Sequence, residues 1–277
     1  MGQTSESPGS GSHATLSLVS ASQTWKPGQE LLLAFQLDIE AGWHTYWRGI
    51  SDTGQPPQFT LTLPDGFVAK DPIWPAPHRE VSSAIDALDH IYEQQLTVVV
   101  PVTTPAAPQT GAQPVLFKAS GVWLVCKTAC VPEKGEATLT LSAGDGAIAP
   151  KPAAAVQTTI ARSGRPWSQA PKGTQLTHEL GAQSGTCSIT VPGATWLAFY
   201  PDQGCLPMPL LYKEGEAKGA ALRLTLAPQD DPQATSVAGL LEVRGLGDGA
   251  QFFQVNERVK AEPAQAPKGA ESEPQKE

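Results

Sequence analysis

The chain has 277 residues and a formal net charge of −8, with 17% charged and 40% hydrophobic residues. Its 19 Lys and Arg residues form no cluster, which argues against a nucleic-acid-binding surface. No run of about 18 apolar residues is present, so no segment is expected to span a membrane. The 26 Gly and 26 Pro residues favour a turn-rich all-β structure over a helix bundle.

Small, polar and charged residues dominate both ends of the chain. We therefore expect residues 1–12 to be a disordered N-terminus and residues 263–277 to be a linker or tail. Between these ends, short apolar runs alternate with turns that contain Gly or Pro, which is typical of short strands. A Gly-, Ala- and Pro-rich stretch at 143–152 predicts a boundary between two domains, 13–148 and 149–262.

The first predicted domain holds seven short runs with strand character, which favours an immunoglobulin-like β-sandwich. Thr138-Leu139-Thr140-Leu141, for example, alternates as a half-buried strand should. The predicted strands are Ala14–Ser20, Glu30–Glu40, Trp43–Trp47, Gln58–Leu63, Gln95–Thr103, Val115–Val125 and Glu136–Ser142.

The second predicted domain starts with a helix over Pro152–Arg162, which has Pro at its first position and Gly164 just past its end. Six strands follow, enough for a second, smaller immunoglobulin-like sandwich. The predicted strands are Thr174–Leu180, Cys187–Val191, Thr195–Tyr200, Ala221–Leu226, Val237–Val243 and Gln251–Val259.

Cys126 and Cys130 flank a loop of three residues at the end of an apolar run. A disulfide needs Cα atoms within about 7 Å, whereas four extended residues span about 13 Å, so a bonded pair requires the chain to fold back. Closing so short a loop stabilises the fold by only roughly 2 kcal/mol. A bond of this kind suits repeated breaking and reforming, and Lys127 would favour a thiolate on Cys126. An ordinary local disulfide and a metal site are the alternatives.

The remaining cysteines, Cys187 and Cys205, are separated by a predicted strand and a turn. A disulfide that closes this longer loop would stabilise the fold by about 3 kcal/mol. We therefore expect a structural disulfide, with a second redox site as the alternative. An even number of cysteines without zinc-type spacing indicates an oxidising compartment. No third soft ligand accompanies Cys126 and Cys130, so no metal is predicted.

Two aromatic segments are candidates for the surroundings of the reactive pair. On the strand Trp43–Trp47, alternation places His44 and Tyr46 on one face and the two Trp residues on the other. That polar face could hydrogen-bond a thiolate or could simply face solvent. Trp74 lies in a Pro-stiffened loop, where it could fill a core edge or cap a site.

Several motifs together resemble the N-terminal periplasmic domain of DsbD-type transmembrane thiol–disulfide reductases, and the Cys-x-x-x-Cys spacing resembles the ScsB branch, which is associated with copper tolerance. The best-known DsbD pattern has five residues between its cysteines, whereas this chain has three. The motifs are Gly-Trp-His-Thr-Tyr-Trp-Arg (42–48), Asp-Thr-Gly-Gln-Pro-Pro (52–57), Leu-Pro-Asp-Gly-Phe (63–67), Trp-Pro (74–75), Tyr92, Gly121 and Cys126-x-x-x-Cys130 followed by Val-Pro-Glu.

The resemblance implies a periplasmic thiol:disulfide oxidoreductase that needs no cofactor. It would receive electrons from a membrane-embedded domain of the same full-length protein and pass them to a thioredoxin-fold protein of the ScsC, DsbC or DsbG type. Cys126 and Cys130 would be the catalytic pair; the family favours Cys130 as the attacking cysteine, whereas Lys127 favours Cys126.

By the same resemblance, His44 and Tyr46 lie near the pair, with His44 standing where the family often has tyrosine. In the family, a cap loop with an aromatic residue at its tip shields the cysteine pair. Trp74 is the closest equivalent of that residue in this chain, and Ile73 is the second choice. The rival hypotheses are a non-enzymatic periplasmic binding or chaperone-like β-sandwich with structural disulfides, and a copper-binding protein.

Overall fold

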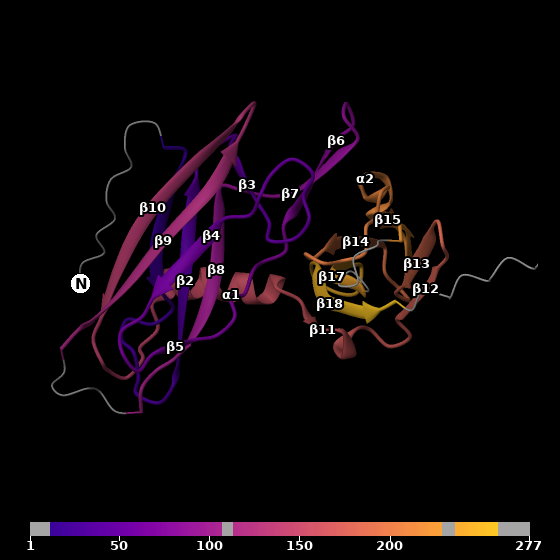
Figure 1. Cartoon of the computed structure of the whole chain (residues 1–277). Helices are drawn as coiled ribbons and strands as arrows, with labels where there is room; N and C mark the ends of the chain where they lie inside the picture. The colour runs from indigo at the N-terminus through magenta and orange to yellow at the C-terminus, as the bar shows by residue number, and fades with distance from the viewer. Residues whose placement is uncertain (1–11, 107–112, 229–235, 260–277) are drawn as a thin grey trace, which may run out of the picture.

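The computed structural model describes residues 12–106, 113–228 and 236–259, and over these ranges the chain is built mainly from β-strands (Figure 1). The all-β prediction is therefore confirmed. Within the same ranges, no helix has the length and apolar character needed to cross a membrane. The predicted disordered segments 1–12 and 263–277 lie outside the described residues except for Ser12, whose hydroxyl donates a hydrogen bond to the Ala14 carbonyl at 2.8 Å.

Two facing sheets make up the N-terminal half. One has the order β1-β2-β8-β5, and the other has the order β10-β9-β3-β7-β6, with β4 also paired to β9. The strands of the first sheet are β1 (Ala14–Ser20), β2 (Glu30–Ile39), β8 (Gln95–Thr103) and β5 (Val68–Ala69). Those of the second are β3 (His44–Tyr46), β4 (Gln58–Thr62), β6 (His78–Ser82), β7 (Ala87–Glu93), β9 (Val115–Cys126) and β10 (Cys130–Leu141).

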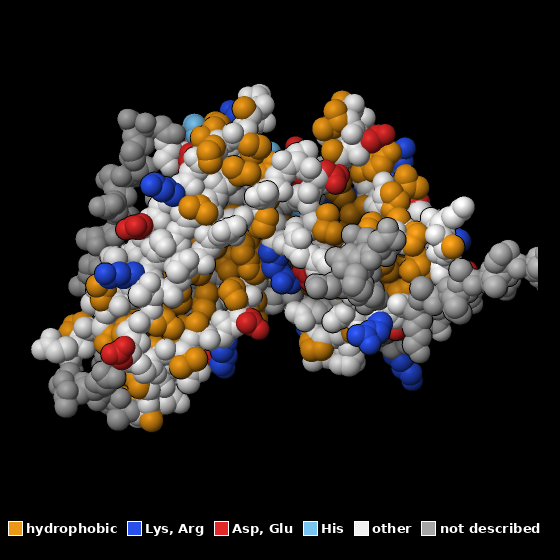
Figure 2. All heavy atoms as spheres, viewed as in Figure 1, with side chains coloured by type: hydrophobic (Ala, Val, Ile, Leu, Met, Phe, Trp, Pro, Cys, Tyr) orange, Lys and Arg blue, Asp and Glu red, His pale blue; other side chains and the backbone are white. Residues whose placement is uncertain are grey.

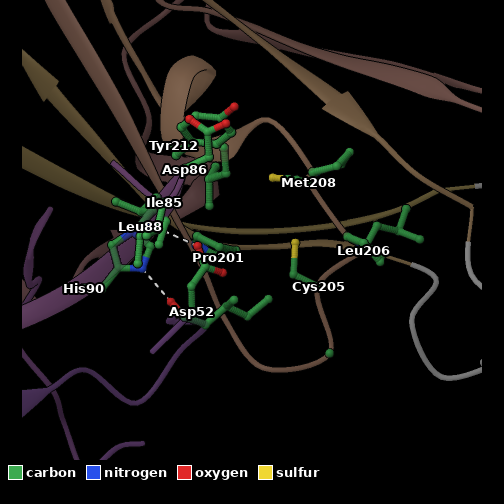
Figure 3. A pocket seen from close by; sticks show the side chains of 16 residues that line it. Asp52, Ile85, Asp86, Leu88, His90, Pro201, Cys205, Leu206, Met208 and Tyr212 are labelled. Atoms are coloured by element: carbon green, nitrogen blue, oxygen red, sulfur yellow. Dashed lines mark hydrogen bonds between the residues drawn. The ribbon is translucent and has the colours of Figure 1, made fainter. Parts of the chain in front are cut away.

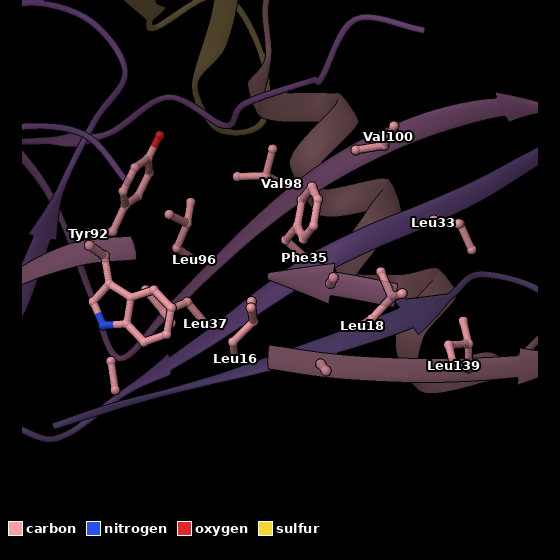
Figure 4. Packing of buried hydrophobic residues seen from close by; sticks show 14 of the residues in the cluster. Leu16, Leu18, Leu33, Phe35, Leu37, Tyr92, Leu96, Val98, Val100 and Leu139 are labelled. Carbon is pink, nitrogen blue, oxygen red and sulfur yellow. The ribbon is translucent and has the colours of Figure 1, made fainter. Parts of the chain in front are cut away.

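Side-chain alternation along these strands builds the core between the two sheets (Figure 4). On β9, Phe117, Trp123 and Val125 point inward and are buried, whereas Val122 on the opposite face is 52% exposed. Each large apolar side chain buried in this way stabilises the fold by about 1.5–3 kcal/mol. The same alternation puts Cys126, the last residue of β9, on the outer face of its sheet.

Helix α1 (Pro150–Arg162) confirms the predicted helix and starts two residues earlier than expected. Its Val156 is buried against Val99 of β8, and Thr159 donates a hydrogen bond to the Thr97 carbonyl at 3.1 Å. The helix thus packs on the outer face of the four-stranded sheet before the chain enters the C-terminal half.

Two smaller sheets make up the C-terminal half, with the orders β11-β18-β17-β14-β15 and β12-β13-β16. All six predicted strands are found there; Ala221–Leu226 has the predicted ends and the other five have shifted ends. The elements are β11 (Arg165–Pro166), η1 (Trp167–Gln169), β12 (Gln175–Leu180), β13 (Gly185–Thr190), β14 (Trp196–Pro201), α2 (Leu211–Glu214), β15 (Glu216–Lys218), β16 (Ala221–Leu226), β17 (Ser236–Arg244) and β18 (Gln251–Arg258).

The cores of the two halves touch. Tyr200, Leu240 and Phe252 of the C-terminal half belong to the N-terminal core cluster, and Leu88 of β7 belongs to the C-terminal cluster. The division into domains at 148 and 149 therefore stays a prediction.

The sequence analysis missed the hairpin formed by β6 and β7, which reaches toward the C-terminal half (Figure 1). Its five-residue strand β6 reads His-Arg-Glu-Val-Ser and is mostly exposed, so it has no apolar alternation to reveal it. The first half of β10 was missed for the same reason, because Cys130–Gly135 alternates only between exposed and half-exposed positions.

Candidate functional site

Strands β9 and β10 form a hairpin whose last paired residues are Cys126 and Cys130. Their Cα atoms lie 4.1 Å apart and their sulfur atoms are bonded at 2.02 Å. In the turn between them, the Lys127 amide donates a hydrogen bond to the Ala129 carbonyl at 3.3 Å. The chain therefore folds back between the cysteines, as a bond across so short a loop requires.

The two cysteines differ in exposure. Cys126 is 4% exposed, because Tyr46, Ile91 and Leu124 pack around it. Cys130 is exposed, because it begins β10, the edge strand of the sheet. A macromolecular partner therefore reaches the sulfur of Cys130 first.

The hydroxyl of Tyr46 lies 3.5 Å from Cys130 Sγ. A disulfide sulfur carries no proton, so the hydroxyl is the donor in this contact. The ring is 1% exposed, and burial raises the pKa of Tyr46, with the nearby carboxylates of Asp89 and Glu80 adding to this effect. Tyr46 therefore keeps its proton and remains a hydrogen-bond donor beside the sulfur.

Thr53 and Asp89 extend the hydrogen-bond network of Tyr46 on the side away from the disulfide. The Thr53 amide donates to Asp89 Oδ1 at 2.9 Å, and its hydroxyl donates to Asp89 Oδ2. The Tyr46 hydroxyl lies 3.5 Å from Thr53 Oγ1 as well as 3.5 Å from Cys130 Sγ, so these two atoms share its single proton. Asp89 and Thr53 thus orient the tyrosine that contacts Cys130.

Gly54 lies against the ring of Tyr46. A Cβ atom at this position would stand 2.0 Å from Tyr46 Cζ, so only glycine fits. The sequence analysis assigned no role to Thr53, Gly54 or Asp89. Thr53 and Gly54 belong to the Asp-Thr-Gly motif that begins at Asp52, so the motif could have pointed to them. Their contact with Tyr46 depends on the tertiary structure and could not be read from the sequence.

The structure brings His44 to the pair as well. It is the residue of β3 that pairs with Cys126, and its Nε2 lies 3.4 Å from the Tyr46 hydroxyl. Lys127 is exposed in the turn, where its Nζ would lie 3.5 Å from a Cβ at Gly42. Its ammonium group therefore lies over the backbone that precedes β3.

Trp74 is placed elsewhere, contrary to the predicted cap position. Its ring packs on Phe59 with centroids 6.2 Å apart, and it lines a cavity of about 460 Å³ together with Arg48 and Asp202. The fallback residue Ile73 forms a bridge with Val99 of β8. Trp74 and Ile73 both pack at the edge of the hydrophobic core. The hairpin of β6 and β7 instead reaches the disulfide, because Ile91 of β7 packs on Cys126.

The predicted disulfide between Cys187 and Cys205 is not formed, and both residues are buried free thiols. Cys187 lies on β13, whereas Cys205 follows β14 of the other sheet and its Sγ accepts a hydrogen bond from the Ala238 amide at 3.4 Å. Burial raises the pKa of Cys187 to about 12 and that of Cys205 to about 11. The prediction was wrong because it rested on chain separation, which does not specify where two side chains point.

Among the described residues, no group of three or more His, Cys, Asp and Glu side chains is arranged to hold a metal ion. The polar surroundings of Cys130 are instead suited to stabilising a thiolate, through a donor hydroxyl that is held by neighbouring groups.

A family model described as "Thiol:disulfide interchange protein DsbD, N-terminal" matches residues 15–142. No curated protein matches the chain. Among solved structures, the N-terminal periplasmic domain of ScsB from Proteus mirabilis aligns with a TM-score of 0.54 and 16% identity, over 89% of this chain and 91% of that one.

Two further solved structures align with lower scores. The major pilin subunit of Bacillus cereus gives a TM-score of 0.30 at 7% identity, over 89% of this chain and 66% of that one. The YadV chaperone gives 0.24 at 12% identity, over 87% and 99%. Neither score reaches that of the ScsB domain, with which this chain shares its fold. Residues 15–142 thus form an N-terminal domain of the DsbD/ScsB type, and the chain has the fold of the ScsB N-terminal periplasmic domain.

Proposed function

We propose that Cys126 and Cys130 are the reacting pair of a periplasmic thiol:disulfide oxidoreductase and that Cys130 is the attacking residue. The observation that carries this proposal is the unequal exposure of a bonded pair, with Cys126 4% exposed and Cys130 open beside Tyr46. The partner is a thioredoxin-fold periplasmic protein of the ScsC, DsbC or DsbG type. The electrons come from a membrane-embedded domain of the same full-length protein.

The reaction is a pair of thiol–disulfide exchanges. The Cys130 thiolate attacks one sulfur of the partner's disulfide, forming a mixed disulfide and releasing the second partner sulfur as a thiolate. The Cys126 thiolate then attacks Cys130 Sγ, restores the Cys126–Cys130 bond and releases the other partner thiolate. The partner gains two electrons, the pair loses two, and no cofactor is consumed.

Tyr46 stabilises the charged state of Cys130 in this scheme. Its hydroxyl lies 3.5 Å from Sγ and is positioned by Thr53, which is bound to Asp89. A hydrogen bond to a charged acceptor is about twice as strong as a neutral one, so the contact strengthens when the disulfide is reduced to a thiolate. In the reverse direction, the same hydroxyl stabilises Cys130 as the leaving group.

Trapping of the mixed disulfide tests the assignment. The Cys126→Ser variant keeps the attacking thiol and lacks the resolving one, so it should accumulate a covalent complex with an oxidised thioredoxin-fold partner. The Cys130→Ser variant should accumulate at least about tenfold less, because its remaining thiol is buried. Equal trapping by both variants would contradict the preference for Cys130, and trapping only by Cys130→Ser would assign the attack to Cys126.

The matched control replaces Cys187 and Cys205 with Ser in otherwise intact protein. Because both thiols are buried in the C-terminal core, this variant should reduce the partner at the unchanged rate. Loss of partner reduction in this control alone, with the fold intact, would place the reacting pair in the C-terminal half.

A further inference from the structure

The hairpin of β6 and β7 separates the reactive disulfide from the C-terminal half and presents a different set of side chains to each. Its register pairs Arg79 with His90, Glu80 with Asp89 and Val81 with Leu88. Because side chains alternate along a strand, Glu80 and Asp89 share one face and the other two pairs share the opposite face.

The face with Asp89 belongs to the disulfide site. Asp89 binds Thr53, and Glu80 is close enough to raise the pKa of Tyr46. Ile91, two residues further along β7, packs on Tyr46 and Cys126. The titratable side chains gathered around Tyr46 are thus the two carboxylates of the hairpin and His44 of β3.

The opposite face is attached to the C-terminal half. The Arg79 side chain is 6% exposed; its Nη2 donates a hydrogen bond to the Leu211 carbonyl at 2.8 Å, and its Nη1 lies 3.2 Å from a Glu216 carboxylate oxygen. A Cβ atom at Gly215 would stand 2.7 Å from Arg79 Nη2, so the guanidinium lies directly on the backbone between α2 and β15. Leu88 is buried in the C-terminal core.

Packing near the tip of the hairpin is loose. Ile85 and Leu88 line a cavity of about 660 Å³ together with Leu206, Met208 and Tyr212 of the C-terminal half (Figure 3). Ile85 is 67% exposed, and Figure 2 shows hydrophobic side chains at this tip. Since Ile85 at the tip is largely exposed, the buried Leu88 side chain and the buried Arg79 contacts carry much of the attachment.

We propose that Arg79 is a positioning residue for the disulfide site, through which the C-terminal half holds the β6–β7 hairpin so that Asp89 and Thr53 keep Tyr46 directed at Cys130. The inference rests on the proposed function and gives the C-terminal half a role in it. The guanidinium touches no reacting atom and acts only through the hairpin.

The experiment measures the pH dependence of alkylation of reduced Cys130 by iodoacetamide in the full chain. The Arg79→Ala variant should alkylate about threefold to tenfold more slowly at pH 7 and at the unchanged rate at high pH, so that its pH–rate midpoint moves upward. Arg79→Lys keeps a cation within reach of Glu216 and should restore part of the difference. Glu216→Gln removes only the ion pair and should give a smaller shift in the same direction.

The matched control is Asp202→Ala, which removes another ion pair between the halves, with Arg48 at 3.0 Å, and does not involve the hairpin. Its pH–rate profile should match that of the unmodified protein. Unshifted profiles in folded Arg79→Ala and Glu216→Gln would overturn the proposal, and so would an equal shift in Asp202→Ala. If Arg79→Ala does not fold, Glu216→Gln alone decides. Because iodoacetamide replaces the protein partner, failure here is distinguishable from failure to reduce a partner.

Discussion

The hydroxyl of Tyr46 lies 3.5 Å from the sulfur of Cys130, the exposed member of the disulfide. A phenol that retains its proton beside a sulfur atom stabilises the thiolate that forms on reduction. The consequences of this contact can be measured on the protein without a partner.

Tyr46→Phe removes the donor and keeps the ring. Hydrogen bonds to charged groups contribute about 1.5–3 kcal/mol, so we expect alkylation of reduced Cys130 at pH 7 to slow by roughly tenfold or more. The rate at high pH, where the thiol is fully ionised, should stay the same. Tyr212→Phe, on α2, is the control. An unchanged pH–rate profile would show that the hydroxyl does not act on the sulfur.

Gly54→Ala should displace the Tyr46 ring, because the added Cβ would stand 2.0 Å from Cζ. Overpacking of this kind costs about 1–3 kcal/mol of unfolding free energy. A double-mutant cycle with Tyr46→Ala, measured by chemical denaturation, checks the cause. In the Tyr46→Ala background the glycine substitution should cost much less, and an additive result would mean that the clash lies elsewhere.

Trp74→Ala should destabilise the fold without changing access to the disulfide. The partly buried ring packs on Phe59 and against the N-terminal core, so its removal should cost less than the roughly 3–5 kcal/mol of a fully buried Trp. We expect a lower melting temperature together with an unchanged alkylation rate of reduced Cys130 by a bulky maleimide. A faster reaction in the folded variant would restore the cap role that the sequence suggested.

His90 should make the stability depend on pH. Its burial lowers the pKa to about 4 from 6.5, while its Nδ1 lies 2.6 Å from the Ile50 carbonyl oxygen. Between these values the unfolded chain binds a proton that the folded chain does not, so stability falls as the pH drops from 6.5 through 4. The loss reaches about 3 kcal/mol.

Chemical denaturation between pH 7 and pH 4 checks the role of His90. The His90→Phe variant should lose less stability over this range than the unmodified protein, and His178→Gln, on β12, should lose the same amount. Equal pH dependence in the unmodified protein and in His90→Phe would show that His90 does not titrate between these values.

The four cysteines should react in a defined order after reduction. Cys130 is exposed and should be alkylated first, followed by the buried Cys126. The pKa of Cys205 rises from 9.0 to about 11, so its thiolate is at least about 100-fold rarer at pH 8 than that of an ordinary thiol. Peptide mapping of native and denatured samples should find Cys187 and Cys205 labelled only after unfolding, and rapid native labelling would contradict their burial.

Sequence patterns alone determined the all-β class, a helix expected over Pro152–Arg162 and observed over Pro150–Arg162, and the fold-back that a bond between Cys126 and Cys130 requires. These features follow from local rules, namely the period of apolar residues, the preference of proline for a helix start and the short reach of a disulfide bond. The polar face of His44 and Tyr46 was also within reach of the sequence, because alternation along one strand is local.

The tertiary structure decided everything that depends on which elements meet. Only the register of the sheet shows that Cys126 is covered and Cys130 open, and only the fold brings Asp89 to Thr53. Trp74 and the pair of Cys187 and Cys205 were misjudged for one physical reason. Their contacts join residues far apart in the chain, and neither the character of a loop nor the number of residues between two cysteines specifies where a side chain points.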